Sequence, residues 1–260
     1  MNLTYSSYLK LPQLLDLQKV KSDPPEHDEM LFIVIHQTYE LWFKLMLHEL
    51  DRVKRDFTKG DLYGAIHTFK RLRTIMKTLV GQLDILETMT PMSFTSFRDR
   101  LETSSGFQST QFRELEFVLG YKRPNVIKYL HESDPAYAIV EQRLMARSVY
   151  DHFYDFLGHF EVEVPPHVLE KPADAPNQGD ETVQEGLYRL YTTRPDVAIL
   201  LELMTDFDEG LQEWRYRHVK IVERTIGAKQ GTGGSPGVEF LKKSLFTPVF
   251  PDLWAIRHRL

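Results

Sequence analysis

Apolar side chains recur at steps of three and four residues over most of the chain, which is the spacing of one inward face of an α-helix. One long stretch runs from His27 to about Phe57 and ends at Lys59-Gly60, where a glycine suits the residue after a helix. A second runs from about Asp61 to Thr88, and a third from Asp196 to Thr225. The pattern therefore predicts three long amphipathic helices.

Shorter segments with the same spacing predict further helices near Ser93–Leu101, Ser109–Leu119, Ala136–Phe160 and Val238–Leu245. Between them, Val164 to Gly179 holds four prolines and little periodicity, which predicts a loop. No run alternates with period two, no repeat is evident, and composition does not shift along the chain. We expect an all-α fold, a bundle of long and short helices in a single domain covering residues 1–260.

His218 interrupts the apolar face of the third long helix. The face is formed by Leu200, Met204, Phe207, Leu211 and Trp214, and the next positions in the series are His218 and Ile221. An imidazole placed where a leucine is expected needs a partner. A core histidine bonded to a carbonyl or carboxylate is the commoner arrangement, and a metal or haem ligand is the alternative that carries chemistry.

His36 is the second histidine of interest. It lies beside the apolar face of the first long helix, one turn beyond Phe32. It could face His218 across a flat cofactor. On spacing alone, a boundary histidine packed on aromatic neighbours is the commoner arrangement.

Two loops are rich in small residues. Gly227–Gly237 follows a helix instead of a strand and lacks the Gly-Lys-Thr ending of a phosphate-binding loop. Its glycines allow the backbone to approach a ligand, with Thr232 offering a hydroxyl and an amide, or they form a plain connector.

The second loop, Thr103–Ser109, follows a short helix that carries Arg98 near its inner end. An arginine there could hold a carboxylate by paired donors. A surface ion pair with Asp99 or Glu102 is the commoner outcome.

Composition narrows the function classes. The net charge is −5, so there is no electrostatic footprint for nucleic acid. Basic runs such as Arg215, Arg217 and Lys220 are interspersed with acidic residues, which is typical of a solvated helix face. With no cysteine, disulfides, zinc–thiolate sites, iron–sulfur clusters and thiolate-ligated haem are excluded. No signal peptide or membrane-spanning run is visible, and we expect a cytoplasmic location.

Several segments, taken in order, resemble the tryptophan 2,3-dioxygenase family, and the resemblance covers nearly the whole chain. The matching stretches are Thr4–Leu9, His27–Ile33, His36–Trp42, Leu86–Pro91, Phe97–Asp99, Ser104–Ser109, Trp214–His218 and Gly231–Gly234. Each is weak alone, but their order and spacing together are specific.

The resemblance implies a b-type haem enzyme that acts on L-tryptophan and O2 and gives N-formyl-L-kynurenine. It implies that His218 is the axial iron ligand and that His36 is the distal histidine facing the indole nitrogen. It also implies that Phe32 walls the indole pocket and that Ser105 lies near the distal haem face.

For the rest of the substrate, the resemblance implies that Arg98 binds the carboxylate and Thr232 the ammonium group. Phe94 and Phe112 stand where some bacterial members have tyrosines, one of which helps to hold the carboxylate, so Arg98 carries more of that role here. Residues 1–20 resemble a segment that completes a neighbouring subunit's pocket through Tyr5, Tyr8 and Leu9. The family forms homotetramers.

Two other functions remain open from the sequence. A relative with the same fold could be a haem-dependent monooxygenase of indoles or aromatic amino acids, although a simple indole would not need Arg98. A haem-binding gas sensor or a helical scaffold is a non-enzymatic alternative, although a sensor should carry an output module.

Overall fold

The computed structural model describes residues 2–130, 135–227, 229, 231 and 237–260. Within them the secondary structure is helical and contains no strand, which confirms the all-α prediction. The elements are α1 (Tyr5–Leu9), α2 (Leu11–Leu14), α3 (His27–Thr58), α4 (Leu62–Leu86), α5 (Pro91–Arg98), η1 (Asp99–Leu101), η2 (Gly106–Gln108), α6 (Thr110–Val118), η3 (Pro124–Tyr129), α7 (Tyr137–Met145), α8 (Val149–Gly158), α9 (Pro166–Leu169), α10 (Glu181–Thr193), α11 (Pro195–Ile226), α12 (Val238–Lys242), α13 (Pro251–Ala255) and η4 (Ile256–Arg259).

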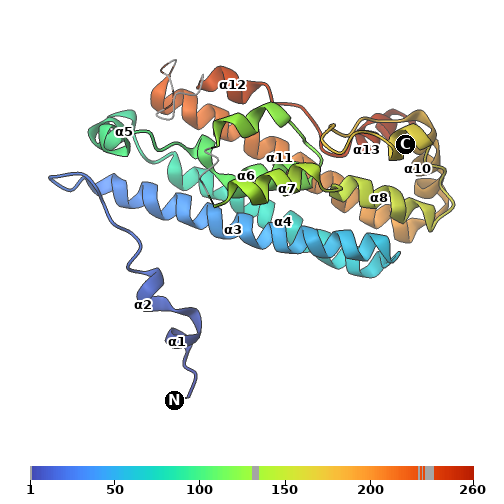
Figure 1. Cartoon of the computed structure of the whole chain (residues 1–260), viewed down its shortest axis with the longest axis horizontal. Helices are drawn as coiled ribbons and strands as arrows, with labels where there is room; N and C mark the ends of the chain where they lie inside the picture. Colours follow the sequence, from blue (N-terminus) through green and yellow to red (C-terminus); the bar gives the residue numbers. More distant parts are fainter. Residues whose placement is uncertain (1, 131–134, 228, 230, 232–236) are drawn as a thin grey trace.

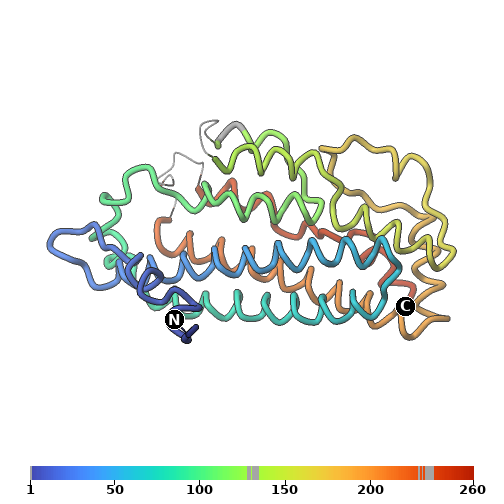
Figure 2. Tube along the Cα trace, turned by 60° about the horizontal axis from the view of Figure 1, so that its bottom comes forward, coloured from blue at the N-terminus to red at the C-terminus, as the bar shows by residue number. Residues whose placement is uncertain are grey.

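Three long helices, α3, α4 and α11, run along the length of the molecule (Figure 1). α4 packs against both of the others, antiparallel to α3 and parallel to α11 (Figure 2). Gly210 permits the close approach of α11 to α4, because a Cβ atom there would lie 3.3 Å from the Cβ of Met76. α6 and α8 cover α3, whereas α10 and α13 pack on α11.

One continuous hydrophobic core fills the space between these helices. Towards the end formed by α8 and α13 it is a cluster of fully buried aromatic rings contributed by Phe57, Phe69, Phe153, Phe156, Phe207 and Phe250. Burying such rings is a main source of folding free energy, and their edge and tilted contacts add to it. These rings fill the interior of this end of the bundle, and the cavity described below lies towards the opposite end.

The prediction of one helix over Ala136–Phe160 was wrong, because the chain forms α7 and α8 with a break between them. Ala146 is extended, with ψ of 155°, and Ser148 caps α8 by accepting a hydrogen bond from the amide of Asp151. The Asp151 carboxylate accepts in return from the Ser148 amide at 2.7 Å. Ser148 and Asp151 form a capping box, a signal that the sequence carried and that periodicity alone did not detect.

Other short elements were not predicted. α10 begins after Asp180, whose side chain accepts hydrogen bonds from the amides of Thr182 and Val183. The sequence analysis also did not predict the short helices α1, α2 and α13 or the single turn α9. The three long helices agree with the predicted spans to within a few residues at their ends, as expected for boundaries read from periodicity.

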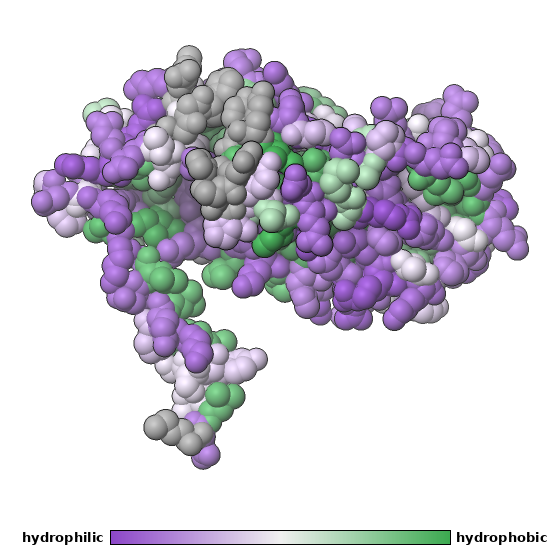
Figure 3. Space-filling model, viewed as in Figure 1, coloured by the Kyte–Doolittle hydropathy of each residue, from purple (hydrophilic) through white to green (hydrophobic). Residues whose placement is uncertain are grey.

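The segment with α1 and α2 projects away from the bundle as an N-terminal arm, residues 2–20 (Figure 1). Its hydrophobic side chains face solvent, with Tyr5 76%, Tyr8 68% and Leu9 40% exposed. Figure 3 shows hydrophobic surface at several places along the arm. Exposed apolar surface of this kind is typical of a segment that docks on another surface.

Within the described part of the chain, each helix is too short or too polar to cross a lipid bilayer.

Candidate functional site

A cavity of about 270 Å³ lies where α3, α4, α5 and α11 meet the loop before α6. It brings together Phe32, His36, Arg98, Ser105 and His218, residues that the sequence analysis singled out from four separate segments. Thr232 lies outside the described residues. Tyr5, Tyr8 and Leu9 are on the N-terminal arm and do not belong to the cavity lining described for their own chain.

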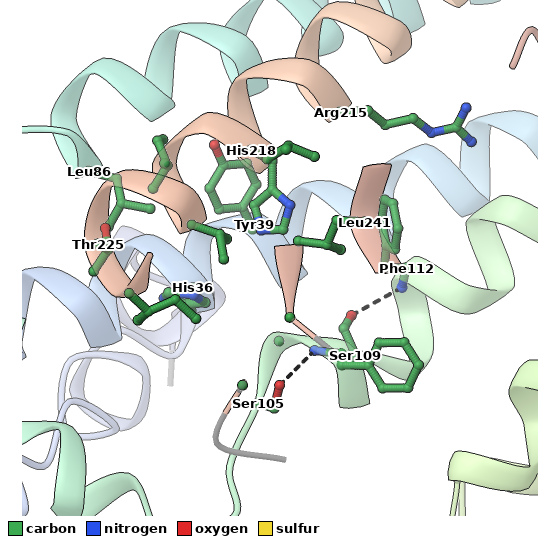
Figure 4. A pocket seen from close by; sticks show the side chains of 18 of the residues that line it. His36, Tyr39, Leu86, Ser105, Ser109, Phe112, Arg215, His218, Thr225 and Leu241 are labelled. Carbon is green, nitrogen blue, oxygen red and sulfur yellow. Dashed lines mark hydrogen bonds between the residues drawn. The ribbon is translucent and has the colours of Figure 1, made fainter. Parts of the chain in front are cut away.

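His218 points into this cavity from α11 (Figure 4). Its ring stacks on Trp214, one turn earlier, with ring centroids 5.1 Å apart and an angle of 3° between the planes. Burial, with a smaller effect of the nearby His36, lowers the pKa of His218 to about 4. The imidazole is therefore neutral at pH 7, with a nitrogen lone pair available.

The alternative of a core histidine bonded to a carbonyl or carboxylate does not fit His218. Its ring makes no hydrogen bond or ion pair with any residue in the described ranges, and part of its surface faces the cavity. A polar ring whose nitrogens lack a hydrogen-bond partner on an apolar helix face is unfavourable unless a ligand contacts it.

His36 faces the cavity from α3 and is held in one tautomer. Its Nδ1 lies 2.7 Å from the carbonyl oxygen of Phe32. Since a carbonyl only accepts, Nδ1 donates, and Nε2 is left as an acceptor. Burial lowers the pKa of His36, although the bond to Phe32 and the charge of Glu40 act in the opposite direction. A neutral imidazole with an acceptor nitrogen results.

The wall beside His36 is aromatic. The centroid of the Phe32 ring lies 4.1 Å from that of the His36 ring, 5.7 Å from that of Phe94 and 5.6 Å from that of Phe97. Leu86 and Met89 continue the apolar lining. Such a surface favours a flat, apolar ring over a charged ligand.

Ser105 lies in a loop that is fixed to α3 by Glu40. The Ser109 hydroxyl donates to Glu40 Oε1 at 2.6 Å, and the Gln111 side-chain amide donates to Oε2 at 2.8 Å. Ser105 caps η2 by accepting from the amide of Phe107 at 3.3 Å (Figure 4). Sequence reasoning missed Glu40, although it is four residues after His36 and therefore on the same face of α3.

Arg98 is the last residue of α5 and lines the cavity. Arg215 also lines it, from α11, and here the structure corrects the sequence interpretation. The basic run containing Arg215 was expected to be solvated, yet Arg215 is only 3% exposed. Its Nη1 donates to the carbonyl of Thr247 at 2.9 Å. The other two basic residues of the run agree with the expected solvated face, since Arg217 pairs with Asp84 and Glu87 and Lys220 pairs with Glu223.

Comparison with known proteins identifies relatives over the full length. A family model described as Tryptophan 2,3-dioxygenase matches residues 1–199 and 186–260. A protein of that name from Herpetosiphon aurantiacus is 49% identical over 255 residues, which cover 98% of this chain and 97% of the relative. Another from Anaeromyxobacter sp. (strain K) is 48% identical over 258 residues, 99% of this chain and 96% of the relative. One from Bacillus thuringiensis subsp. konkukian is 40% identical over 262 residues, 100% of this chain and 93% of the relative.

Proposed function

Since the chain belongs to the tryptophan 2,3-dioxygenase family, we propose that it is a haem-dependent enzyme that inserts both atoms of O2 across the indole C2–C3 bond of L-tryptophan. The product is N-formyl-L-kynurenine. The observation that carries the proposal is a pair of neutral imidazoles, His36 from α3 and His218 from α11, that enter one largely apolar cavity (Figure 4).

The residues present fit a b-type haem. His218 offers a neutral nitrogen on a buried helix face, and the apolar and aromatic lining suits a porphyrin. Within the described residues there is no cluster of three His, Asp or Glu side chains for a bare metal ion, whereas haem brings four nitrogen ligands of its own. Bound ferrous haem supplies O2 binding and activation.

His218 would hold the haem iron, and the indole would bind in the part of the cavity lined by His36. We infer that His36 Nε2 accepts the indole N–H, because the bond from Nδ1 to Phe32 fixes that tautomer. An indole N–H is a very weak acid, so an imidazole whose ordinary pKa is about 6.5 is poorly matched to remove its proton. His36 therefore orients the ring, and Phe32 packs against the ring's face.

The amino-acid part of tryptophan needs polar partners. We infer that Arg98 binds its carboxylate from the C-terminal end of α5 and that Ser105 borders the distal side of the haem. Thr232, expected to bind the ammonium group, stays a prediction from the sequence.

The function is tested by the product. Ferrous enzyme given L-tryptophan and isotopically labelled O2 should release a ring-opened N-formyl ketone that carries both labelled atoms, with one O2 consumed per product. A hydroxylated indole with a single labelled atom would instead establish the monooxygenase alternative.

Replacing His36 with alanine should reduce turnover without abolishing it. Loss of correct positioning costs roughly a hundredfold, and the substrate still occupies the aromatic pocket. The measurement is kcat and the Kd of tryptophan on ferrous enzyme. His48→Ala, on an exposed part of α3, is the matched control and should be unchanged. Complete loss of turnover with normal tryptophan binding would mean that His36 is an obligatory base.

We also propose that the enzyme is a cytoplasmic homotetramer in which the N-terminal arm, residues 2–20, docks on a neighbouring subunit. Support comes from the exposure of Tyr5, Tyr8 and Leu9 on a segment that projects from its own bundle. An arm of this kind is normally disordered or docked.

Deleting residues 2–9 should weaken tryptophan binding more than haem binding, because the arm is expected to complete the neighbour's substrate pocket and not the haem contacts. Isothermal titration and haem content measure the two effects, and sedimentation gives the assembly. Gln13→Ala, also exposed on the arm, serves as the control. An active monomer in sedimentation would contradict the proposal.

A further inference from the structure

Three arginines and one glutamate gather on the side of the cavity where Figure 4 shows Arg215, across His218 from Leu86 and Thr225. This arginine cluster consists of Arg113, Arg123, Arg215 and Glu116, all of which line the cavity. We propose that the arginine cluster binds the two propionate carboxylates of the haem, with one of them held by Arg215. The inference rests on the proposed haem function and adds to it which edge of the porphyrin faces which wall.

Arg215 presents a donor pair that has no partner among the residues the structure describes. The side chain is 3% exposed, and within those residues neither Nε nor Nη2 has a hydrogen-bond partner, while Nη1 donates to the Thr247 carbonyl. Nε–H and Nη2–H point the same way from one edge of the planar guanidinium, so they can donate to both oxygens of one carboxylate. Buried donors of this kind are costly unless a ligand meets them.

The protein's own carboxylates nearby are already engaged. Glu116 is 3% exposed and accepts two hydrogen bonds of 2.8 Å from Arg123, and it pairs with Arg113 as well. Asp208 attracts Arg215 at longer range, but one of its oxygens accepts from Val249, Phe250 and Trp254 and the other from Gln212. Neither is bonded to the free edge of Arg215.

Charge balance within the arginine cluster fits two carboxylates. Three guanidinium groups against one Glu116 carboxylate leave an excess of two positive charges within the arginine cluster, and the Asp208 carboxylate offsets part of this excess at longer range. A haem carries two propionates on one edge, which would bring the arginine cluster to neutrality. Burying charge is tolerated when it is paired in this way.

The arginine cluster is held in place before any ligand binds. Arg123 and Arg215 lie over the ring of Tyr121, at 4.6 and 4.8 Å, and Arg113 lies 5.3 Å from the ring of Phe107. Cation–π contacts of this type fix planar guanidinium groups. The donors are thus preorganised, which lowers the entropy lost on binding.

The position relative to His218 also fits. Arg215 precedes His218 by three residues on α11, about one helical turn. In Figure 4 the Arg215 guanidinium lies on the side of Phe112, and Leu86 and Thr225 lie on the other side of His218. A porphyrin held by His218 would therefore direct its propionate edge towards Arg215 and its apolar edge towards Leu86.

The test compares haemin with haemin dimethyl ester, which has the same ring and iron but no carboxylates. Full-length protein freed of haem is titrated with each, without tryptophan, and the Soret band gives both dissociation constants. For the unaltered protein we expect the ester to bind at least about tenfold more weakly, the scale of a lost charge-assisted hydrogen bond. Equal affinities would overturn the inference, and this comparison needs no variant that must fold.

Variants locate the effect. In Arg215→Met the preference for the free acid should shrink severalfold or more, and in Arg215→Lys, which keeps a charge, only part of it should be lost. Arg52→Met, which changes a half-exposed arginine on α3, is the matched control and should keep the full preference. An unchanged preference in folded Arg215→Met would also overturn the inference.

The two proposals fail differently. His218→Ala should weaken both ligands to the same extent, since it removes the iron ligand and not the carboxylate contacts. Binding of both ligands that does not depend on His218 would contradict the proposed haem ligation. If binding depends on His218 but is equally tight for haemin and its dimethyl ester, only the role of the arginine cluster is overturned.

Discussion

Replacing His218 with alanine is expected to release the haem. The variant removes the neutral nitrogen that α11 presents to the cavity, and no cysteine exists to replace it. Because the pKa of His218 is lowered to about 4, the native imidazole is fully available as a ligand at pH 7. We expect haem occupancy after purification to fall at least tenfold, measured by the Soret band and by iron content.

Three observations make this result specific. His36→Ala changes the other cavity imidazole and should keep its haem, so it is the control for a general disturbance of the cavity. His218→Gly supplemented with free imidazole should recover part of the haem, because the small residue leaves room for the added ring. Full occupancy with unchanged ligand-field bands in His218→Ala would show that another group holds the iron.

The long helices could be predicted because their periodicity extends over many turns. α3, α4 and α11 bury residues every three to four positions, and one missing apolar residue in that series drew attention to His218. The break between α7 and α8 could not be read from periodicity, because apolar residues continue across it. It depends on the cap that Ser148 and Asp151 form.

The sequence predicted site residues only where a local pattern marked them, and it did not predict the tertiary contacts between them. Arg215 follows Leu211 by four residues and so lies on its buried face, but charge in a basic run suggested solvent instead. Its partners Arg113 and Glu116 come from α6, about a hundred residues earlier, and no local pattern reports that contact. The anchoring of Ser109 by Glu40 is likewise a tertiary contact.

Replacing Arg98 with leucine is expected to separate tryptophan from indole as ligands. Tryptophan is a zwitterion, and burying its carboxylate in an apolar cavity is costly unless a charged donor meets it. Arg98 lines the cavity beside Phe94, which is buried and has no hydroxyl to share the carboxylate. We therefore expect Arg98→Leu to weaken L-tryptophan binding by about 2–5 kcal/mol, the cost of removing one partner of a buried charge pair.

Indole has no carboxylate, so its affinity for Arg98→Leu should hardly change, because the aromatic wall around Phe32 and the acceptor nitrogen of His36 remain. Both affinities are measured on the ferrous enzyme. Arg100→Leu, two residues away and exposed, removes the same charge outside the cavity and should leave both affinities intact. Equal losses for tryptophan and indole in Arg98→Leu would mean that Arg98 supports the fold of α5 and not the substrate, and the carboxylate would then need another partner.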